Sequence, residues 1–600
     1  MSDRGVFDPG LPVKVLLERY PVARPVLSSY GLDACCGGEH PLSQACAARG
    51  VPLDRVLEDL ESAHRVAEAY NLVPPTMSVK EVRRRFPATI PVLERYGLGD
   101  CGGEEGPDEP LAWFATVHRL PLEDFLRDIR EAAVRDAAAA PRAAAPASAA
   151  APFSPHFILG SLFLTLTLGA TTGMINLLRI AAGADVPISH RQIHGHTQIL
   201  GFAALFLMGI AYHALPRILG IGALRPASAR PAFWLMFGGV ILRNAGQPLG
   251  AYAIGRALSL VSAGLEAASV LLFARFVFAL LARVRAGLRA QAAPPKAGKY
   301  EPSEPILRFV RVGTIFFGVA IAIVAAQGIW LAGHIETALP VALTEAFYFA
   351  ALYGFLLAFI YGFGNRVVSL FLGLGPAARG TPEAALWLQT ASVPVFLASY
   401  APGVALAPAV ALRDAGLALA ALSALVYLAG NGFLWRRAVL PVMRAPGAPT
   451  AAIRCAFGCL ALWAILELSA IVVSRATAIP ARNLWWSDAA RHVFTVGFLT
   501  LLIVGMSLRI LPVFSGKSLW SPRLAYVTYA LLLAGAGMRL LQYPAAFSPV
   551  FYRIGSFMGV PVVLAILLFA FNLVRTMKGA RPPGRPATRP AVFASTLPVR

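Results

Sequence analysis

The chain has 600 residues, of which 57% are hydrophobic and only 14% are charged. Soluble globular proteins are about 45–50% apolar and about 25% charged, so this composition excludes an ordinary soluble enzyme and a disordered protein. A net charge of +21 is sometimes a sign of nucleic-acid binding. Here the basic residues stand in short runs between long apolar stretches, which argues against nucleic acid and is typical of a multi-pass membrane protein.

Charge and composition divide the chain into parts. Residues 1–150 hold 22 of the 32 acidic residues but only 17 of the 53 basic ones, so this part is acidic and the remainder strongly basic. We interpret the parts, in chain order, as a helical cysteine-containing module, a second degenerate copy of it, an Ala/Pro-rich linker, a membrane domain and a disordered basic tail. Their predicted bounds are 1–74, 75–135, 136–152, 153–578 and 579–600.

The N-terminal module contains an internal repeat. PVKVLLERYPVARPVLSSYGLDACCGG (12–38) aligns with SVKEVRRRFPATIPVLERYGLGDCGG (78–103), so that Tyr30 corresponds to Tyr96. The first copy carries Cys35, Cys36 and Cys46, whereas the second keeps only Cys101. In a reducing cytoplasm such cysteines are more often thiols or metal ligands than disulfides. The three cysteines of the first copy are therefore candidate metal ligands, with a purely structural turn as the alternative.

The membrane domain has room for twelve helices, because a spanning helix needs about 20 apolar residues. Lys and Arg gather in alternate loops, such as 283–299 and 436–444, on the side of the N-terminal module. This bias predicts a multi-pass protein of the bacterial inner membrane with both termini in the cytoplasm. The expected spans lie near 154–182, 191–215, 231–253, 258–283, 309–334, 341–365, 385–405, 408–435, 453–475, 490–511, 523–543 and 549–575.

One glycine pattern occurs three times in the membrane domain. In each copy a first glycine is followed, at identical spacings, by a second glycine, a basic residue and a last glycine. Self-similarity at a nearly fixed period indicates structural repeats. The alternative is coincidence among glycines that serve close helix packing. We therefore predict an all-α fold with about twelve transmembrane helices in three pseudo-repeats of four. The copies are Gly201, Gly209, His213 and Gly220; Gly354, Gly362, Arg366 and Gly373; and Gly497, Gly505, Arg509 and Gly516.

Two histidines occupy one repeat position. His196 and His492 each stand five residues before the first glycine of their copy, which we call the repeat glycine. In a ring of three units, equivalent positions are expected to point inward, so these two imidazoles are predicted to ligate a heme b from opposite sides. Arg243 and Arg539 also share one position, since both follow their repeat glycine at the same spacing. Buried arginines need an anion, and the heme propionates are the predicted partners.

His194 points about 200° away from His196 on a helix, so the two cannot easily share one metal. We expect His194 to face a second metal or heme, with His190 on the same helix face. The alternative for all these residues is that they are helix-end histidines at the membrane interface.

Two resemblances cover most of the chain. HGHTQILGFAALFLMGIAYHALPRILG resembles the HxH helix of heme–copper oxidase subunit I, and together with RHVFTVGFLTLLIVGMSLRILPVFSG it is most similar to the NnrS family. The N-terminal YGLDACCGG segment resembles the ScdA-type (DUF542) domain of proteins that repair iron–sulfur centres. These resemblances imply a twelve-helix membrane protein of nitric-oxide metabolism and stress that contains heme and copper.

The sequence also departs from the oxidase pattern. That pattern needs histidines on the sixth and seventh helices, whereas this chain has Phe349 at the repeat position of the sixth and no histidine on the seventh. No complete dinuclear centre is evident, so whether the protein is an enzyme stays open. His334 and Glu345, with Glu336 and Tyr348 nearby, form a candidate substitute site for copper or non-heme iron; a solvated loop is the alternative.

Two acidic residues, Glu266 and Glu467, lie deep in the apolar segments and are candidates for proton relay or for structural pairing. Overall, the sequence predicts a heme-containing, possibly copper-containing, inner-membrane protein of the nitrosative-stress response that protects or maintains metal centres. Its expected partners are lipid, nitric oxide or another diatomic ligand, and an electron donor. One alternative is a redox enzyme resembling nitric-oxide reductases or terminal oxidases with an atypical site. Another is a cofactor-free transporter.

Overall fold

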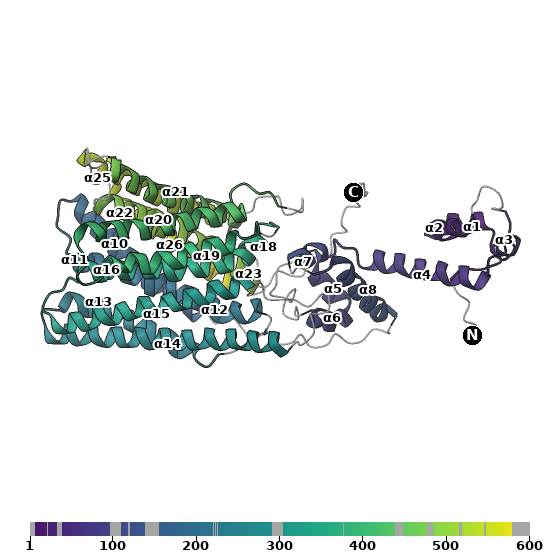
Figure 1. Ribbon diagram of the computed structural model, residues 1–600, viewed down its shortest axis with the longest axis horizontal. Helices are drawn as coiled ribbons and strands as arrows, with labels where there is room; N and C mark the ends of the chain where they lie inside the picture. Colours follow the sequence, from purple (N-terminus) through teal and green to yellow (C-terminus); the bar gives the residue numbers. More distant parts are fainter. Residues whose placement is uncertain are drawn as a thin grey trace. The chain divides into compact units, whose positions relative to one another are not determined.

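In the residues that it describes, the computed structural model consists of helices joined by turns and loops, without a β-strand (Figure 1). The predicted all-α fold class is thus confirmed. The chain divides into two units, one that ends at Ser148 and one that begins at Ala149. The tail at 579–600 and most of the linker at 136–152 lie outside the described residues. Those residues are 6–20, 22–32, 39–96, 110–117, 120–138, 155–219, 221, 224, 226–290, 304–375, 377–438, 448–476, 484–514, 519–544 and 548–578.

The N-terminal unit contains the same sequence of elements twice. An isolated β-bridge joins Pro12 to Pro41 in the first copy, and one joins Ser78 to Pro110 in the second, each just before the first and third helices of its copy. Each copy has a separate apolar core. The first copy holds α1 (Val13–Arg19), α2 (Ala23–Ser29), α3 (Leu42–Arg49) and α4 (Leu53–Leu72); the second holds α5 (Val79–Arg85), η1 (Pro87–Thr89) with α6 (Ile90–Arg95), α7 (Leu111–Val117) and α8 (Leu122–Ala138).

The membrane unit is a bundle of long helices. Ten helices in the described residues are long and apolar enough to span a membrane by length and composition. Two of the twelve predicted spans do not meet this criterion. They are α13 (Ala229–Gly246) and α19 (Thr381–Ala398), which carry polar residues such as Arg243 and Gln389 within their 18 residues. Both are nevertheless helical and pack along α14 (Ala253–Ala290) and α20 (Leu406–Asn431).

Three helices form the inside of this bundle, and each is the second helix of a predicted repeat. About 78–94% of their apolar windows is buried, against at most 50% for the other spans. Each changes from α- to π-helix at the same repeat position. The three are α11 (Ile188–His196), η3 (Thr197–Ala204) and α12 (Leu205–Ile218); α16 (Val341–Phe349), η5 (Ala350–Leu356) and α17 (Leu357–Phe363); and α22 (Leu484–His492), η8 (Val493–Thr500) and α23 (Leu501–Phe514).

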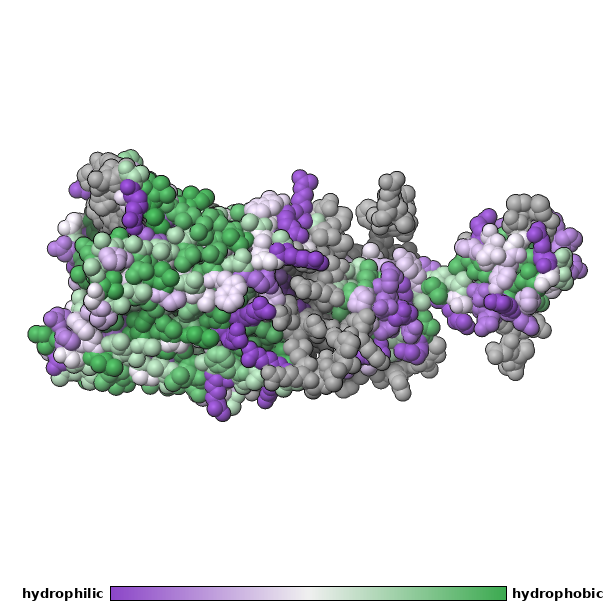
Figure 2. Space-filling view, viewed as in Figure 1, coloured by the Kyte–Doolittle hydropathy of each residue, from purple (hydrophilic) through white to green (hydrophobic). Residues whose placement is uncertain are grey.

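The remaining helices surround these three. Large apolar side chains such as Trp234, Leu271 and Ile315 are exposed on them, and Figure 2 shows hydrophobic side chains over much of the visible face of the bundle. Such a surface is suited to lipid. The outer helices not yet named are α9 (His156–Leu164) with η2 (Thr165–Gly169) and α10 (Ala170–Ala181), α15 (Glu304–Gly333), α21 (Ala448–Ala476), α24 (Pro522–Arg539) with η9 (Leu540–Gln542), and α26 (Gly559–Lys578).

Close approach of helices explains the repeated glycines. The second glycine of the first and third copies faces the first helix of its own unit. A Cβ at Gly209 would lie 2.4 Å from the Cβ of Phe157, and a Cβ at Gly505 would lie 2.9 Å from that of Ala452. These distances are below ordinary van der Waals contact, so only glycine permits the packing. In these two copies the second glycine thus has an equivalent neighbour, which supports the predicted repeats.

Candidate functional site

Two histidines from different repeat units meet inside the bundle. The rings of His194 on α11 and His492 on α22 are parallel to within 6°, with centroids 6.4 Å apart. Nδ1–H of His194 donates to the Gly169 carbonyl (3.0 Å), and Nδ1–H of His492 donates to the Asp488 carbonyl (2.8 Å). Because a carbonyl oxygen can only accept, each ring carries a proton on Nδ1, and in the neutral imidazole the lone pair is then on Nε2. This is the tautomer that a metal-binding imidazole uses.

His196 does not face His492, which corrects the pairing expected from the sequence. It lies on the other side of α11, where its Nε2 contacts Glu266 Oε1 at 2.8 Å. Both side chains are almost completely buried. The ring of Phe347, rather than a second imidazole, lies beside His196, with centroids 5.6 Å apart.

The geometric reason is a stagger between neighbouring units. His194 stands seven residues before its repeat glycine, and His492 stands five before its own. The same stagger brings Phe347, at minus seven in the second unit, against His196, at minus five in the first. Equivalent positions therefore do not meet. The contact between the first and third units has a histidine on both sides.

An acidic residue that the sequence analysis missed supports His492. Asp488 Oδ1 lies 3.3 Å from His492 Nδ1, and Asp488 Oδ2 accepts a hydrogen bond from Arg539 Nη2. The same Arg539 nitrogen lies 3.5 Å from both ring nitrogens of His492. The repeat contained a signal for Asp488, because Gln192, Glu345 and Asp488 all stand nine residues before their repeat glycines.

Arg243, the repeat counterpart of Arg539, has different surroundings. It is 1% exposed, and it donates from Nε to Gln247 Oε1 (3.1 Å) and from Nη2 to Gln327 Oε1 (3.0 Å). Its Nη1 is buried and has no partner among the described residues. The structure thus gives Arg539 a carboxylate of the protein itself, whereas Arg243 is bonded to two neutral amides.

The predicted substitute metal site is not assembled. His334 is exposed, stacks on Trp330 at 4.4 Å and donates from Nδ1 to the Trp330 carbonyl. Glu345 instead forms an ion pair with Arg491 at 2.7 Å. His190 is half-buried, and its carbonyl accepts a hydrogen bond from Asn176 at 3.4 Å. Within the described ranges, no group of three or more His, Cys, Asp or Glu side chains is placed to hold a metal.

The cysteines of the N-terminal module can be placed only in part. Cys46 is 1% exposed and belongs to the apolar core of the first copy. Burial raises the pKa of its thiol, so the reactive thiolate form is disfavoured. Cys35 and Cys36, the other two candidate ligands of this module, lie outside the described residues.

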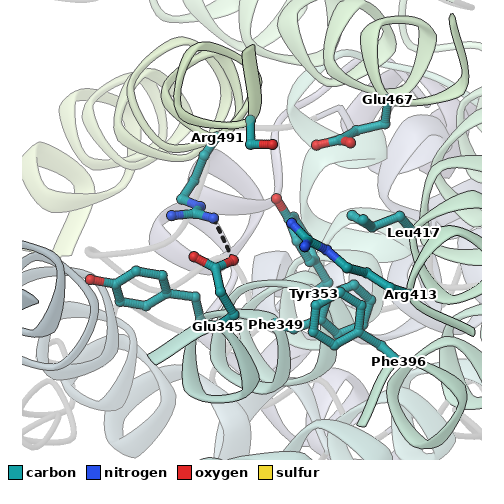
Figure 3. Close-up of a pocket in the computed structure, with 10 residues that line it drawn as sticks. Glu345, Phe349, Tyr353, Phe396, Arg413, Leu417, Glu467 and Arg491 are labelled. Atoms are coloured by element: carbon teal, nitrogen blue, oxygen red, sulfur yellow. Dashed lines mark hydrogen bonds and ion pairs between the residues drawn. The ribbon is translucent and has the colours of Figure 1, made fainter. Parts of the chain in front are cut away.

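A polar cavity of about 20 Å³ lies between the second and third repeat units. Two arginines and two glutamates line it, so its formal charges balance. Figure 3 shows the ion pair of Arg491 and Glu345 on one side and Glu467 on the other. The polar side chains that line it are Glu345, Tyr348, Tyr353, Arg413, Glu467, Ser487 and Arg491.

Two protein families match the chain. Residues 12–64 match ScdA_N, a domain of unknown function (DUF542). Residues 147–581 match the NnrS protein family, and this match spans the whole bundle described above. No curated protein matches the chain. Because the second match covers well over half of the residues, this multi-pass membrane protein belongs to the NnrS family.

Proposed function

We propose that this chain is a metal-containing membrane protein of the nitric-oxide and nitrosative-stress response, and that His194 and His492 are its metal ligands. Heme iron is the first candidate, and a copper ion is the second. The single observation that carries the proposal is the parallel pair of imidazoles, each with its proton held on Nδ1. NnrS family membership supports the nitric-oxide context.

The separation of the two rings supports one metal between two opposed imidazoles. A metal–imidazole bond of about 2.0–2.1 Å on each side separates the ring centroids of two opposed ligands by about 6 Å. The observed separation of 6.4 Å agrees with this. Space for the His194 ring depends on Gly173, because a Cβ there would lie 2.4 Å from His194 Cε1.

The protein's own groups orient the ligands. The carbonyls of Gly169 and Asp488 fix the two rings and their tautomers. The Asp488 carboxylate and the Arg539 guanidinium lie beside His492 and set the local charge. Such surrounding groups tune the affinity and potential of a metal. A heme iron held by both imidazoles would supply electron transfer, and nitric oxide would have to displace one of the two histidines to bind it.

The remaining parts of the proposal concern location and role. We place the protein in the bacterial inner membrane with both termini in the cytoplasm, on the basis of the basic loops. A role in protecting or maintaining metal centres is proposed from the resemblance of the N-terminal segment to proteins that repair iron–sulfur centres. An electron donor is required if the metal changes oxidation state. Nothing observed favours an oxidase-like enzyme, since Glu345 is paired with Arg491 and His334 lies at the surface.

The test is an optical spectrum, oxidised and reduced, with iron and copper analysis of the purified full-length protein. His194→Ala and His492→Ala should each abolish the sharp reduced bands of a six-coordinate heme, or the bound copper. His196→Gln and the surface variant His334→Ala should keep them. Loss of the bands in His196→Gln with retention in His194→Ala would restore the pairing expected from the sequence. A wild type without metal after heme- and copper-supplemented expression would favour the cofactor-free transporter.

A further inference from the structure

We propose that the cavity between the second and third units is a proton-exchange site, in which the buried carboxyl of Glu467 exchanges protons with the surface through a bound water, Tyr353 and Glu345. This inference goes beyond the proposed function, because it uses only side chains of the protein and needs no metal.

The cavity is large enough for an ordered water and offers it partners. A buried water needs about 10–15 Å³ and two to four polar groups, and the cavity has about 20 Å³. Hydroxyls of Tyr353 and Ser487 and the carboxylates of Glu345 and Glu467 line it. Nε of Arg413 is buried with no partner in the part of the chain that the structure describes, so it is a donor available to that water.

Exposure decreases from one side of the cavity to the other. The side chains of Arg491 and Glu345 are 23% and 19% exposed, whereas Glu467 is 5% exposed. Figure 3 shows the Tyr353 hydroxyl between Glu345 and Glu467, and that hydroxyl interacts electrostatically with both carboxylates. The groups therefore form a short path from the partly exposed ion pair to a buried acid.

Acidic, basic and hydroxyl groups surround Glu467. The groups that face it are Tyr353 and Glu345 from the second unit, Arg413 from α20, Ser487 and Arg491 from α22, and Tyr543 after η9. Arg491 forms an ion pair with Glu345 at 2.7 Å. Arg413 is therefore the second cation of the cavity that can face an ionised Glu467. Buried carboxyl groups with polar neighbours in membrane bundles commonly serve proton transfer.

The other candidate from the sequence has a different environment. Glu266 is fully buried, and its Oε1 contacts His196. The hydroxyl of Ser262 donates a long hydrogen bond, of 3.5 Å, to the same oxygen. Its side chain is fitted closely against α13, because a Cβ at Gly239 would lie 2.6 Å from Glu266 Cγ. Glu266 is therefore a structural partner of His196, whereas Glu467 borders a space large enough for a water.

The transfer moves one proton and no electron. A protonated Glu345 carboxyl donates its proton to the cavity water, and the water gives one of its protons to the Glu467 carboxylate. The water ends unchanged, Glu345 returns to its ion pair with Arg491, and Glu467 is neutral. The Tyr353 hydroxyl donates to whichever carboxylate is ionised, so it stabilises the charge at both ends of the path.

The experiment is infrared difference spectroscopy of the full-length, metal-depleted protein between about pH 4 and about pH 9, in H₂O and D₂O. Wild type should show a pH-dependent, D₂O-sensitive C=O band of a protonated carboxyl. Glu467→Gln should remove this band, and Glu467→Asp should shift it. Tyr353→Phe should slow its appearance after a pH jump. Glu336→Gln, a change at an exposed residue outside the cavity, should leave the band unaltered.

Two results would overturn the inference. One is a wild-type carboxyl spectrum that does not change with pH. The other is a pH-dependent band that survives unaltered in both Glu467→Gln and Glu467→Asp. Because the protein is depleted of metal, neither result bears on the imidazole pair, and the optical test above stands by itself. If Glu467→Gln does not fold, the band shift in Glu467→Asp still decides.

Discussion

Exchanging either of two histidines on α11 for leucine should affect stability very differently. His196 contacts Glu266 at 2.8 Å in a fully buried pair. His196→Leu leaves the buried Glu266 carboxyl without this partner, and removing one member of such a buried pair costs about 3–5 kcal/mol when the carboxyl is ionised. Arg243 interacts electrostatically with Glu266 and partly compensates, so the lower end of that range is expected. His194→Leu leaves only the Gly169 carbonyl without its donor, a loss of about 1–3 kcal/mol.

The assay is unfolding of the metal-depleted protein by a denaturing detergent, followed by circular dichroism. His196→Leu should unfold at a clearly lower detergent fraction than His194→Leu. The double variant His196→Leu/Glu266→Leu removes both polar groups and should recover most of the loss, since an apolar pair of similar size can replace a buried polar pair. Equal destabilisation by the two single variants, or no recovery in the double variant, would refute the structural role assigned to His196.

Three further predictions concern other parts of the chain. Burial and a hydrogen bond to Asp128 raise the pKa of Tyr96 to about 12. The unfolded chain therefore loses this proton at a lower pH than the folded chain, and the free energy of unfolding should fall from about pH 10 to about pH 12. Denaturant titrations should show this fall in wild type and a smaller one in Tyr96→Phe. The thiol of Cys46 should react with iodoacetamide at least about tenfold more slowly in the folded than in the denatured protein, as followed by mass spectrometry of its peptide. Gly209→Ala should destabilise the bundle by about 1–3 kcal/mol in detergent unfolding, whereas Gly318→Ala, where nothing lies within 4 Å of the new Cβ, should not.

The architecture was predictable because its signals are local or periodic. Apolar stretches of about 20 residues located the helices, and the glycines at 201, 354 and 497 revealed three units from spacing alone. The same holds for the N-terminal module, where the alignment of Tyr30 with Tyr96 corresponds to two copies with matching helices and matching β-bridges. Spacing along the chain carries this information directly.

The pairing of side chains was not predictable in the same way. Which residue faces His492 depends on how far each inner helix is rotated and shifted against its neighbour, and sequence spacing within one helix does not report this. The assumption that equivalent positions meet placed His196 opposite His492, whereas the stagger brings His194 there. Arg491 and Glu345 illustrate the same limit, since they stand 146 residues apart in the sequence and form an ion pair between two units.

The π-helical segments at the repeat glycines have a consequence for how the inner helices can vary. A π-turn holds about one residue more than an α-turn, and each α-helical residue turns the chain by about 100°. The segments η3, η5 and η8 therefore act as phase shifts between the two halves of each inner helix. The half that carries the histidines and acids can keep its angular setting while the other half packs on its own neighbours. A continuous α-helix of the same length in place of η8 would turn Asp488 and His492 by about 100° away from Arg539 and His194, whereas deletion of one residue within η8 would close the α-helix and leave both side chains facing as they do.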